Sequence, residues 1–206
     1  QLTNHEVSLL INGLTEFKEE KPSHWFYTFV LLALHTGLRP GDLLSLTWQE
    51  LNINFKRLVK VPEKTRHHSS PTKIIMDLTE QTIADIKPWW ELQGKPNAGL
   101  VFKSPRTGNS ISRGGYRKAW SKLKKQAGLD EKLDFYALRH DFISRLVAAG
   151  VPLLTVARLA GHKSAKMIEQ HYGHLCPASA SHALQALEIS RQPELPSPPL
   201  LSGYSD

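Results

Sequence analysis

"AGHKSAKMIEQHYGHL", residues 160–175, contains one tyrosine between two histidines, ten residues after a Gly-His pair. This tyrosine, Tyr172, could be a packing residue, the neighbour of a metal site or a nucleophile. A phenol is a weak nucleophile near neutral pH, because its pKa is about 10. If Tyr172 attacks a substrate, other residues must stabilise the charge that develops on the target, and the rest of the chain should contain them.

The segments on either side of Gly161 have helical patterns. "VPLLTVARLAG" (151–161) is apolar and "SAKMIEQHY" (164–172) is more polar, so we expect two helices joined by a turn at Gly161-His162. An apolar helix, a glycine turn and a polar helix are also typical of helix-turn-helix DNA-binding proteins. A non-catalytic DNA-binding regulator is therefore the alternative to an enzyme.

The rest of the chain predicts a mainly α fold with one small antiparallel β-sheet. Thr3 and Glu6 have capping-box spacing at the start of the first helix. "RLVKVPE" (57–63) and "TKIIMDL" (72–78) are β-rich and predict a hairpin with a long turn. The other expected helices are 22–37 between Ser23 and Gly37, one starting at Pro40, 79–93 perturbed by Pro88, 111–129 ending near Gly128, 134–150 between Asp134 and Gly150, and 179–190, with a Pro/Ser-rich tail over 191–206.

Composition is that of an ordinary globular protein. The 206 residues are 40% hydrophobic and 22% charged, enough for one good-sized domain or two small ones. No apolar run approaches the length of a membrane span, and no signal-peptide pattern opens the chain. Cys176 is the single cysteine, which excludes an internal disulfide and fits a reducing cytosol. Because the chain begins at Gln1 rather than Met, we expect an excised domain.

The charge balance is basic, with 26 Lys and Arg against 19 Asp and Glu and a formal net charge of +7. Such a balance favours a polyanionic partner, above all nucleic acid, although a solvated basic surface is the alternative. Several of these cations cluster on the helix expected over 111–129, which predicts a basic face. They are Arg113, Arg117, Lys118, Lys122, Lys124 and Lys125.

Two arginines and a lysine become interesting if they converge. Arg39 follows a glycine in "HTGLRPGD" (35–42), and Arg139 lies on a helix with an apolar face in "YALRHDF" (136–142). Taken singly, each is more simply a capping or ion-paired residue. Together, two guanidinium groups match the oxygens of a phosphate and stay charged at any working pH. Lys64, on the hairpin turn, could reach into a groove and donate a proton to a leaving alkoxide.

Histidines are numerous enough to raise the alternative of a zinc site. His162 could cap its helix or donate a hydrogen bond to a phosphate oxygen, whereas His171 and His174 could share a helix face. However, the chain has no HExxH motif, no Cys/His spacing of a zinc site and no carboxylate placed as a third ligand. We therefore expect neither a metal nor another cofactor. The remaining histidines considered for this site are His35, His67, His68 and His140.

Five motifs together resemble the phage integrase, or tyrosine recombinase, family. In order, they are "HTGLRPGDLLSLTW", "PEKTRHH", "YALRHDF", "AGHKS" and "EQHYGHL", and the resemblance covers residues 2–176. It implies an α-rich catalytic domain with a small antiparallel sheet. It also implies site-specific cleavage and rejoining of double-stranded DNA through a 3′-phosphotyrosyl link, without metal or ATP. A type IB-like topoisomerase is the nearest enzymatic alternative.

The resemblance assigns roles to the candidate residues. Tyr172 resembles the nucleophile, Arg39 and Arg139 the clamp on the scissile phosphate, Lys64 the general acid and His162 a further phosphate ligand. The family often has histidine three residues before the second arginine, where this chain has Tyr136. Tyr136 is therefore a less certain member of the site, and His140 resembles a structural residue.

The resemblance also implies a domain organisation and partners. We expect a catalytic domain over 1–176, followed by a C-terminal helix and tail over 177–206. An N-terminal DNA-binding domain, which family members usually carry, is expected to be missing from this chain. The expected partners are specific attachment sites in DNA and further copies of the protein in a synaptic tetramer, in the cytoplasm of a bacterium.

Overall fold

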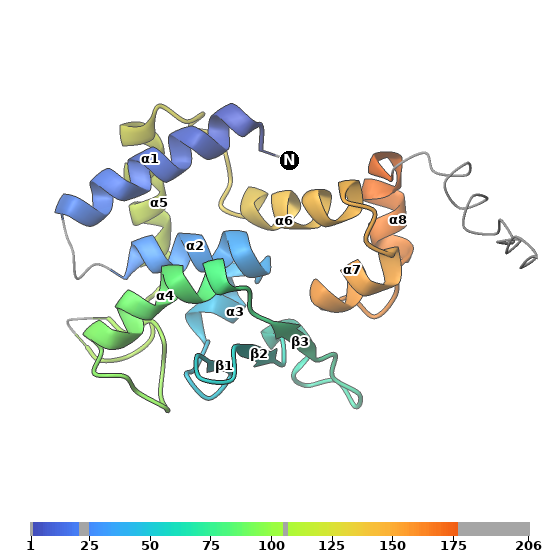
Figure 1. Ribbon diagram of the computed structural model, residues 1–206, viewed down its shortest axis with the longest axis horizontal. Coiled ribbons are helices and arrows are strands. Elements are labelled where there is room, and N and C mark those ends of the chain that lie inside the picture. Colours follow the sequence, from blue (N-terminus) through green and yellow to red (C-terminus); the bar gives the residue numbers. More distant parts are fainter. Residues whose placement is uncertain (1, 21–24, 105–106, 177–206) are drawn as a thin grey trace, which may run out of the picture. The chain divides into compact units, whose positions relative to one another are not determined.

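The computed structural model describes residues 2–20, 25–104 and 107–176, with only the backbone of Glu19 and Glu20. The chain divides after Cys176 into two units, and every described residue belongs to the first. The expected cap Ser23, the helix over 179–190 and the tail over 191–206 lie outside the described residues. Helices and one small sheet make up this unit, so the predicted fold class is confirmed (Figure 1).

The N-terminal helix α1 (Asn4–Glu20) begins as predicted. The Thr3 side chain accepts the Glu6 N–H at 3.1 Å, and the Glu6 carboxylate accepts the Thr3 N–H at 2.7 Å. This reciprocal pair is a capping box, which satisfies two N–H groups that a helix start leaves free.

Helix α2 (Phe26–Thr36) forms the centre of the unit and packs against α1, α4 and α6 (Figure 1). Nearly all its side chains are buried, so its apolar residues face neighbours on every side. It ends at Gly37, which adopts the left-handed conformation at φ 61°. Five aromatic rings surround Phe29 with centroids 5.1 to 6.3 Å away: Trp25, Phe26, Phe102, Tyr116 and Phe135.

The sheet follows the short helix α3 (Pro40–Leu44), which starts at the predicted proline. Its strands are β1 (Leu51–Asn52), β2 (Arg57–Lys60) and β3 (Ile74–Asp77), in the order β1-β2-β3 and antiparallel throughout. The predicted β2–β3 hairpin is confirmed, whereas the two-residue β1 was not anticipated. The 3-10 turn η1 (Glu63–Thr65) lies in the hairpin connection.

Helix α4 (Glu80–Leu92) packs against α2, and helix α5 (Arg113–Ala127) packs against α1. Helix α4 continues through Pro88 without interruption, whereas α5 ends at Gly128 in the left-handed conformation, as predicted. The basic residues of α5 do not all face solvent. Lys124 is 8% exposed, because its ammonium group donates to the carbonyl of Glu131. The prediction that Lys124 belongs to the basic face was therefore wrong.

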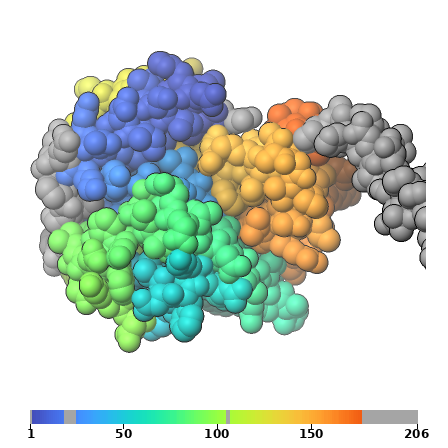
Figure 2. All heavy atoms as spheres, viewed as in Figure 1, coloured from blue at the N-terminus to red at the C-terminus, as the bar shows by residue number. Residues whose placement is uncertain are grey.

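The C-terminal part consists of α6 (Ala137–Ala148), α7 (Leu153–Leu159), α8 (Lys166–Tyr172) and the 3-10 turn η2 (Gly173–Leu175). Helix α6 starts later than expected, because the Asp134 carboxylate accepts the Tyr136 N–H at 2.7 Å and caps a preceding turn. Helix α7 packs against β3, and in Figure 2 the orange atoms of the C-terminal helices lie beside the blue-green atoms of the hairpin. No helix in the described ranges is long and apolar enough to cross a membrane.

Candidate active site

Arg139 connects the segments that form the site. Its side chain is 2% exposed, and it donates from Nη1 to the carbonyl of Gly37 at 2.7 Å and from Nη2 to the carbonyl of Ala160. Burial lowers the pKa of Arg139, and the nearby charge of Arg39 acts in the same direction. Its buried Nε–H has no hydrogen-bond acceptor among the residues that the structure describes. A buried cation with an unused donor is a site for an anion.

His162 lies against Arg139, with its Nε2 3.0 Å from Nη2 of the arginine. A guanidinium can only donate, so Nε2 of His162 accepts and the proton of the neutral ring is on Nδ1. Burial lowers the pKa of His162 to about 4, and the charges of Arg139, Arg39 and Lys64 add to this shift. His162 is therefore neutral at neutral pH, and Nδ1–H is its remaining donor.

A glycine holds His162 in place. Gly161 adopts a φ of 69°, and a Cβ there would lie 2.9 Å from Cδ1 of Ile74 on β3. A side chain would therefore be strained and would push the turn after α7 away from the sheet. The sequence correctly predicted a turn at Gly161-His162. A glycine is needed there because the hairpin strand β3 approaches the turn closely.

Arg39 is the residue immediately before α3, and its side chain is 21% exposed. Its Nη1 lies 3.9 Å from Oδ2 of Asp42. Asp42 is 2% exposed, and its Oδ1 accepts the N–H of Glu63 at 2.7 Å. Burial raises the pKa of Asp42, against the charges of Arg39, Lys60 and Arg139. This carboxylate therefore joins the arginine segment to the hairpin turn.

Asp42 was missed in the sequence, although its position three residues after Arg39 in a helix's first turn was a usable signal. By holding Glu63, it positions the neighbouring Lys64, whose side chain is exposed. Lys64 nevertheless lies close enough to lower the pKa of His162. The lysine therefore belongs to the same electrostatic site as the two arginines.

Tyr172 ends α8, and its half-buried hydroxyl is hydrogen-bonded to Nδ1 of His140. Burial raises the pKa of Tyr172, and Tyr136 adds to this rise, whereas Arg139 opposes it. The ring of Tyr136 is 6.0 Å from the Arg139 guanidinium carbon and 5.0 Å from the His140 ring. The sequence interpretation of His140 as a structural residue did not include this contact of its ring with the tyrosine hydroxyl.

The structure brings together every residue that the sequence singled out for catalysis. These are Arg39, Lys64, Tyr136, Arg139, His162 and Tyr172. They come from segments far apart in the chain: the α2–α3 turn, the hairpin, α6, the α7–α8 turn and α8. The resulting site is rich in positive charge and contains two phenols, those of Tyr136 and Tyr172.

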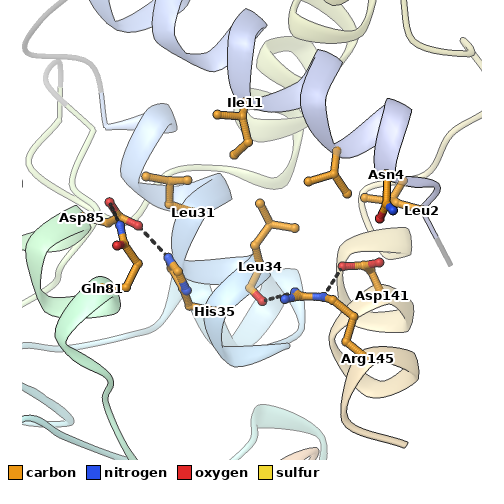
Figure 3. Close-up of a pocket in the computed structure, with 11 residues that line it drawn as sticks. Leu2, Asn4, Ile11, Leu31, Leu34, His35, Gln81, Asp85, Asp141 and Arg145 are labelled. Carbon is orange, nitrogen blue, oxygen red and sulfur yellow. Dashed lines mark hydrogen bonds and ion pairs between the residues drawn. The ribbon is translucent and has the colours of Figure 1, made fainter. Parts of the chain in front are cut away.

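The other histidines do not form a comparable cluster. In the described ranges, no group of three or more His, Cys, Asp or Glu residues could hold a metal ion. His35 is paired with Asp85 at 2.7 Å in a hollow of about 360 Å³ among α1, α2, α4 and α6 (Figure 3). The same hollow contains Arg145, which is paired with Asp141 at 2.7 Å. These four ionisable side chains are thus hydrogen-bonded in pairs.

Comparison with known proteins identifies the family. The sequence model of the phage integrase family matches residues 1–178. The chain belongs to the phage integrase family. It is 26% identical over 204 residues to a XerC-like tyrosine recombinase of Caldanaerobacter subterraneus subsp. tengcongensis, covering 84% of this chain and 52% of that protein. It is 30% identical over 156 residues to the integrase of Salmonella phage P22, covering 72% and 38%.

Solved structures of low sequence identity share the fold of this phage integrase domain. The crystal structure of XerA recombinase has a TM-score of 0.67 at 20% identity, covering 93% of this chain and 64% of that one. The Tn1549 transposon integrase in complex with transposon right end DNA has a TM-score of 0.70 at 18% identity, covering 90% and 65%. The chain spans about half or less of the length of the curated relatives it matches.

Family membership confirms the resemblance that the five motifs suggested. The matched proteins are recombinases and integrases, and neither a non-catalytic regulator nor a topoisomerase is favoured by them. The pair α7 and α8, which had suggested a helix-turn-helix, instead supplies His162 and Tyr172 to one site.

Proposed function

We propose that this chain contains the catalytic site of a site-specific DNA recombinase or integrase of a phage or other mobile element. The site cleaves and rejoins double-stranded DNA through a 3′-phosphotyrosyl intermediate. The observation that carries the proposal is that the Tyr172 hydroxyl lies in one site with the buried Arg139, whose Nε–H has no acceptor among the described residues. A phosphate that enters the site satisfies this donor and comes to lie within reach of the nucleophile.

The cations of the site do the work that a metal ion does in other phosphoryl-transfer enzymes. Arg39 and Arg139 neutralise the non-bridging oxygens of the scissile phosphate, where charge grows in the transition state. His162 is neutral and donates from Nδ1, so it orients the phosphate rather than adding charge. Tyr136 adds a second neutral donor. No metal or nucleotide is required, because the phosphotyrosyl bond conserves the energy of the phosphodiester.

Lys64 is the general acid of this mechanism. Its ammonium group protonates the 5′-oxygen as that oxygen leaves. The exposed side chain on a hairpin turn can move, whereas the hydrogen bond from the Glu63 N–H to Asp42 holds the base of the turn against α3. The lysine is thus tethered to the arginine segment and still free to follow the leaving group.

DNA contacts come from one end of the basic helix α5. The exposed cations of this helix are Arg113, Arg117, Lys118, Lys122 and Lys125. Arg113 lines a shallow pocket with Gly41 and Glu63, which are close in sequence to Arg39 and Lys64 of the site. The other end of α5 turns toward α1, where Lys122 lies over the Phe17 ring. We therefore infer that the N-terminal end of α5 extends the cationic surface along the DNA backbone. Such contacts to phosphates are strongly salt-dependent.

The partners follow from the same proposal. They are specific attachment sites in double-stranded DNA and further copies of the protein in a synaptic tetramer, acting on DNA in the bacterial cytoplasm. In this proposal residues 1–176 form the catalytic domain, and in the family a separate N-terminal domain completes the DNA clamp. The DNA-bound Tn1549 transposon integrase supports the first of these partners.

The test is covalent trapping on nicked DNA. A pool of duplexes with random sequence, each nicked near its centre, is incubated with the protein and separated on a denaturing gel. The wild type should form a protein–DNA adduct, and Tyr172→Phe should form none. Tyr27→Phe is the matched control, because Tyr27 lies on α2 near Lys18 and Asp85, away from the site. If the wild type bound DNA sequence-specifically but formed no adduct, a non-catalytic DNA-binding regulator would be the better interpretation.

A further inference from the structure

The proposed reaction requires a proton acceptor for Tyr172. Burial raises the pKa of this phenol above its ordinary value, so it is protonated at neutral pH. The attacking oxygen must lose this proton as its bond to phosphorus forms. Arg39, Arg139 and Lys64 are cations and cannot accept it at neutral pH. The acceptor must be a neutral base that touches the Tyr172 hydroxyl.

His140 is the base that meets this requirement. Its Nδ1 is the one hydrogen-bond partner of the Tyr172 hydroxyl within the part of the chain that the structure describes. Burial lowers the pKa of His140, and the positive charge of neighbouring Arg139 acts in the same direction. The ring is therefore neutral at neutral pH, with a lone pair free on Nδ1 when the proton is on Nε2.

The other neutral side chains near Tyr172 cannot act as this base. Nε2 of His162 already accepts from Arg139, and with a pKa of about 4 it is a poor base. His171 precedes Tyr172, but its ring centroid is 6.5 Å away, and among the described residues it makes no hydrogen bond to the hydroxyl. Tyr136 is itself a phenol, which does not accept a proton at neutral pH.

We propose that His140 is the general base of this site. In cleavage, the Tyr172 oxygen forms a bond to phosphorus while its proton moves to Nδ1 of His140. The bond between phosphorus and the 5′-oxygen breaks, and that oxygen takes a proton from Lys64. In rejoining, the 5′-hydroxyl returns its proton to Lys64 as it attacks, and His140 gives its proton back to the departing Tyr172 oxygen. This inference rests on the proposed function, and it adds the group that completes the proton balance.

The position of His140 suits this task. It follows Arg139 directly on α6, so the same helix turn fixes the phosphate clamp and the base. The ring is partly exposed to solvent, and its contact with Tyr136 at 5.0 Å fixes its orientation. The proton taken up by His140 can therefore be released to solvent and taken up again without crossing the phosphate site.

The decisive experiment separates the base from the acid. One substrate is a nicked duplex, and the other is a duplex whose cleaved strand ends in a 3′-p-nitrophenyl phosphate. p-Nitrophenolate leaves as a stable anion and needs no proton, so Lys64→Ala should be slow on the first substrate and close to wild type on the second. His140→Gln should slow single-turnover adduct formation about a hundredfold or more on both. His171→Gln, beside the nucleophile, is the control expected to match wild type.

Two further measurements distinguish a base from a positioning residue. Free imidazole should restore adduct formation to His140→Ala, because the ring site is open to solvent. In the free protein, ¹⁵N NMR should show His140 unprotonated at Nδ1, with a resonance that moves in Tyr172→Phe. A wild-type rate in His140→Gln, a failure of imidazole to restore activity, or a protonated Nδ1 would each overturn the proposal. Absence of any adduct with wild type would instead contradict the proposed function, and the NMR result would still decide the contact.

Discussion

Replacing Gly37 with alanine should disturb both the fold and the active site. Gly37 has a φ of 61°, and a Cβ there would lie 2.3 Å from Cδ1 of Phe142. The left-handed conformation costs a residue with a side chain roughly 1–2 kcal/mol, and the forced displacement of a packed ring costs about 1–3 kcal/mol. We therefore expect the free energy of unfolding to fall by roughly 2–5 kcal/mol.

The same substitution should slow catalysis through Arg139. The Gly37 carbonyl accepts a hydrogen bond from Arg139 Nη1 at 2.7 Å, and Phe142 lies one turn after Arg139 on α6. An alanine side chain at position 37 pushes the Phe142 ring away, which displaces the start of α6 and with it the Arg139 guanidinium. Adduct formation should therefore fall even at temperatures where the variant remains folded.

Urea denaturation and single-turnover adduct formation are the two assays, and Gly128→Ala is the matched control. Gly128 has a φ of 67° at the end of α5, but a Cβ there would have nothing within 4 Å. It should lose only the conformational part, about 1–2 kcal/mol, and keep wild-type activity. The reasoning is refuted if Gly37→Ala is no less stable than Gly128→Ala, since the contact with Phe142 would then carry no energy.

Other perturbations test separate parts of the site. Tyr136→Phe should slow adduct formation roughly ten- to a hundredfold, the loss of one neutral hydrogen bond, and Tyr136→His should retain much of the rate, whereas Arg139→Ala should lose far more. EDTA should leave cleavage unchanged. If EDTA abolished cleavage and added zinc or magnesium restored it, the protein would contain a metal site. Wild-type stability should fall as pH drops from 6.5 to about 4, because the unfolded chain protonates His162 while the native site resists it, and His162→Gln should show a smaller fall in acid denaturation curves. Lys60→Met should destabilise the protein by about 3–5 kcal/mol, because it removes the cation paired with the Glu50 carboxylate, and a smaller loss in Lys60→Met/Glu50→Gln would show the coupling.

Local signals predicted most helices, because each depends on residues close together in the chain. The capping box of Thr3 and Glu6 and the left-handed glycines Gly37 and Gly128 are decided within a few residues of the helix end. The site residues could be proposed for a different reason. Their motifs matched a family in order and spacing, although no local rule would place Arg39 beside Arg139.

What the sequence could not predict depends on contacts between distant segments. Lys124 looks like its exposed neighbours, and only its donation to the Glu131 carbonyl shows that it is buried. The Glu63 N–H that donates to Asp42 comes from the hairpin turn, 21 positions away in the chain. The contact of His140 with Tyr172 could not be predicted for the same reason, since it joins α6 to the end of α8.

The position of Arg139 explains how one site can be assembled from so many segments. Its two terminal nitrogens donate to the carbonyls of Gly37 and Ala160, the residues that follow α2 and α7. Arg39 and His162, two residues further along each turn, are therefore held around one guanidinium. These carbonyls occupy part of the fork and leave Nε–H for a ligand. A lysine has a single nitrogen and could not bridge both turns and bind a phosphate in this geometry. Arg139→Lys should therefore lose activity nearly as completely as Arg139→Ala although the charge is kept, and a lysine variant with a near wild-type rate of adduct formation would show that charge alone suffices.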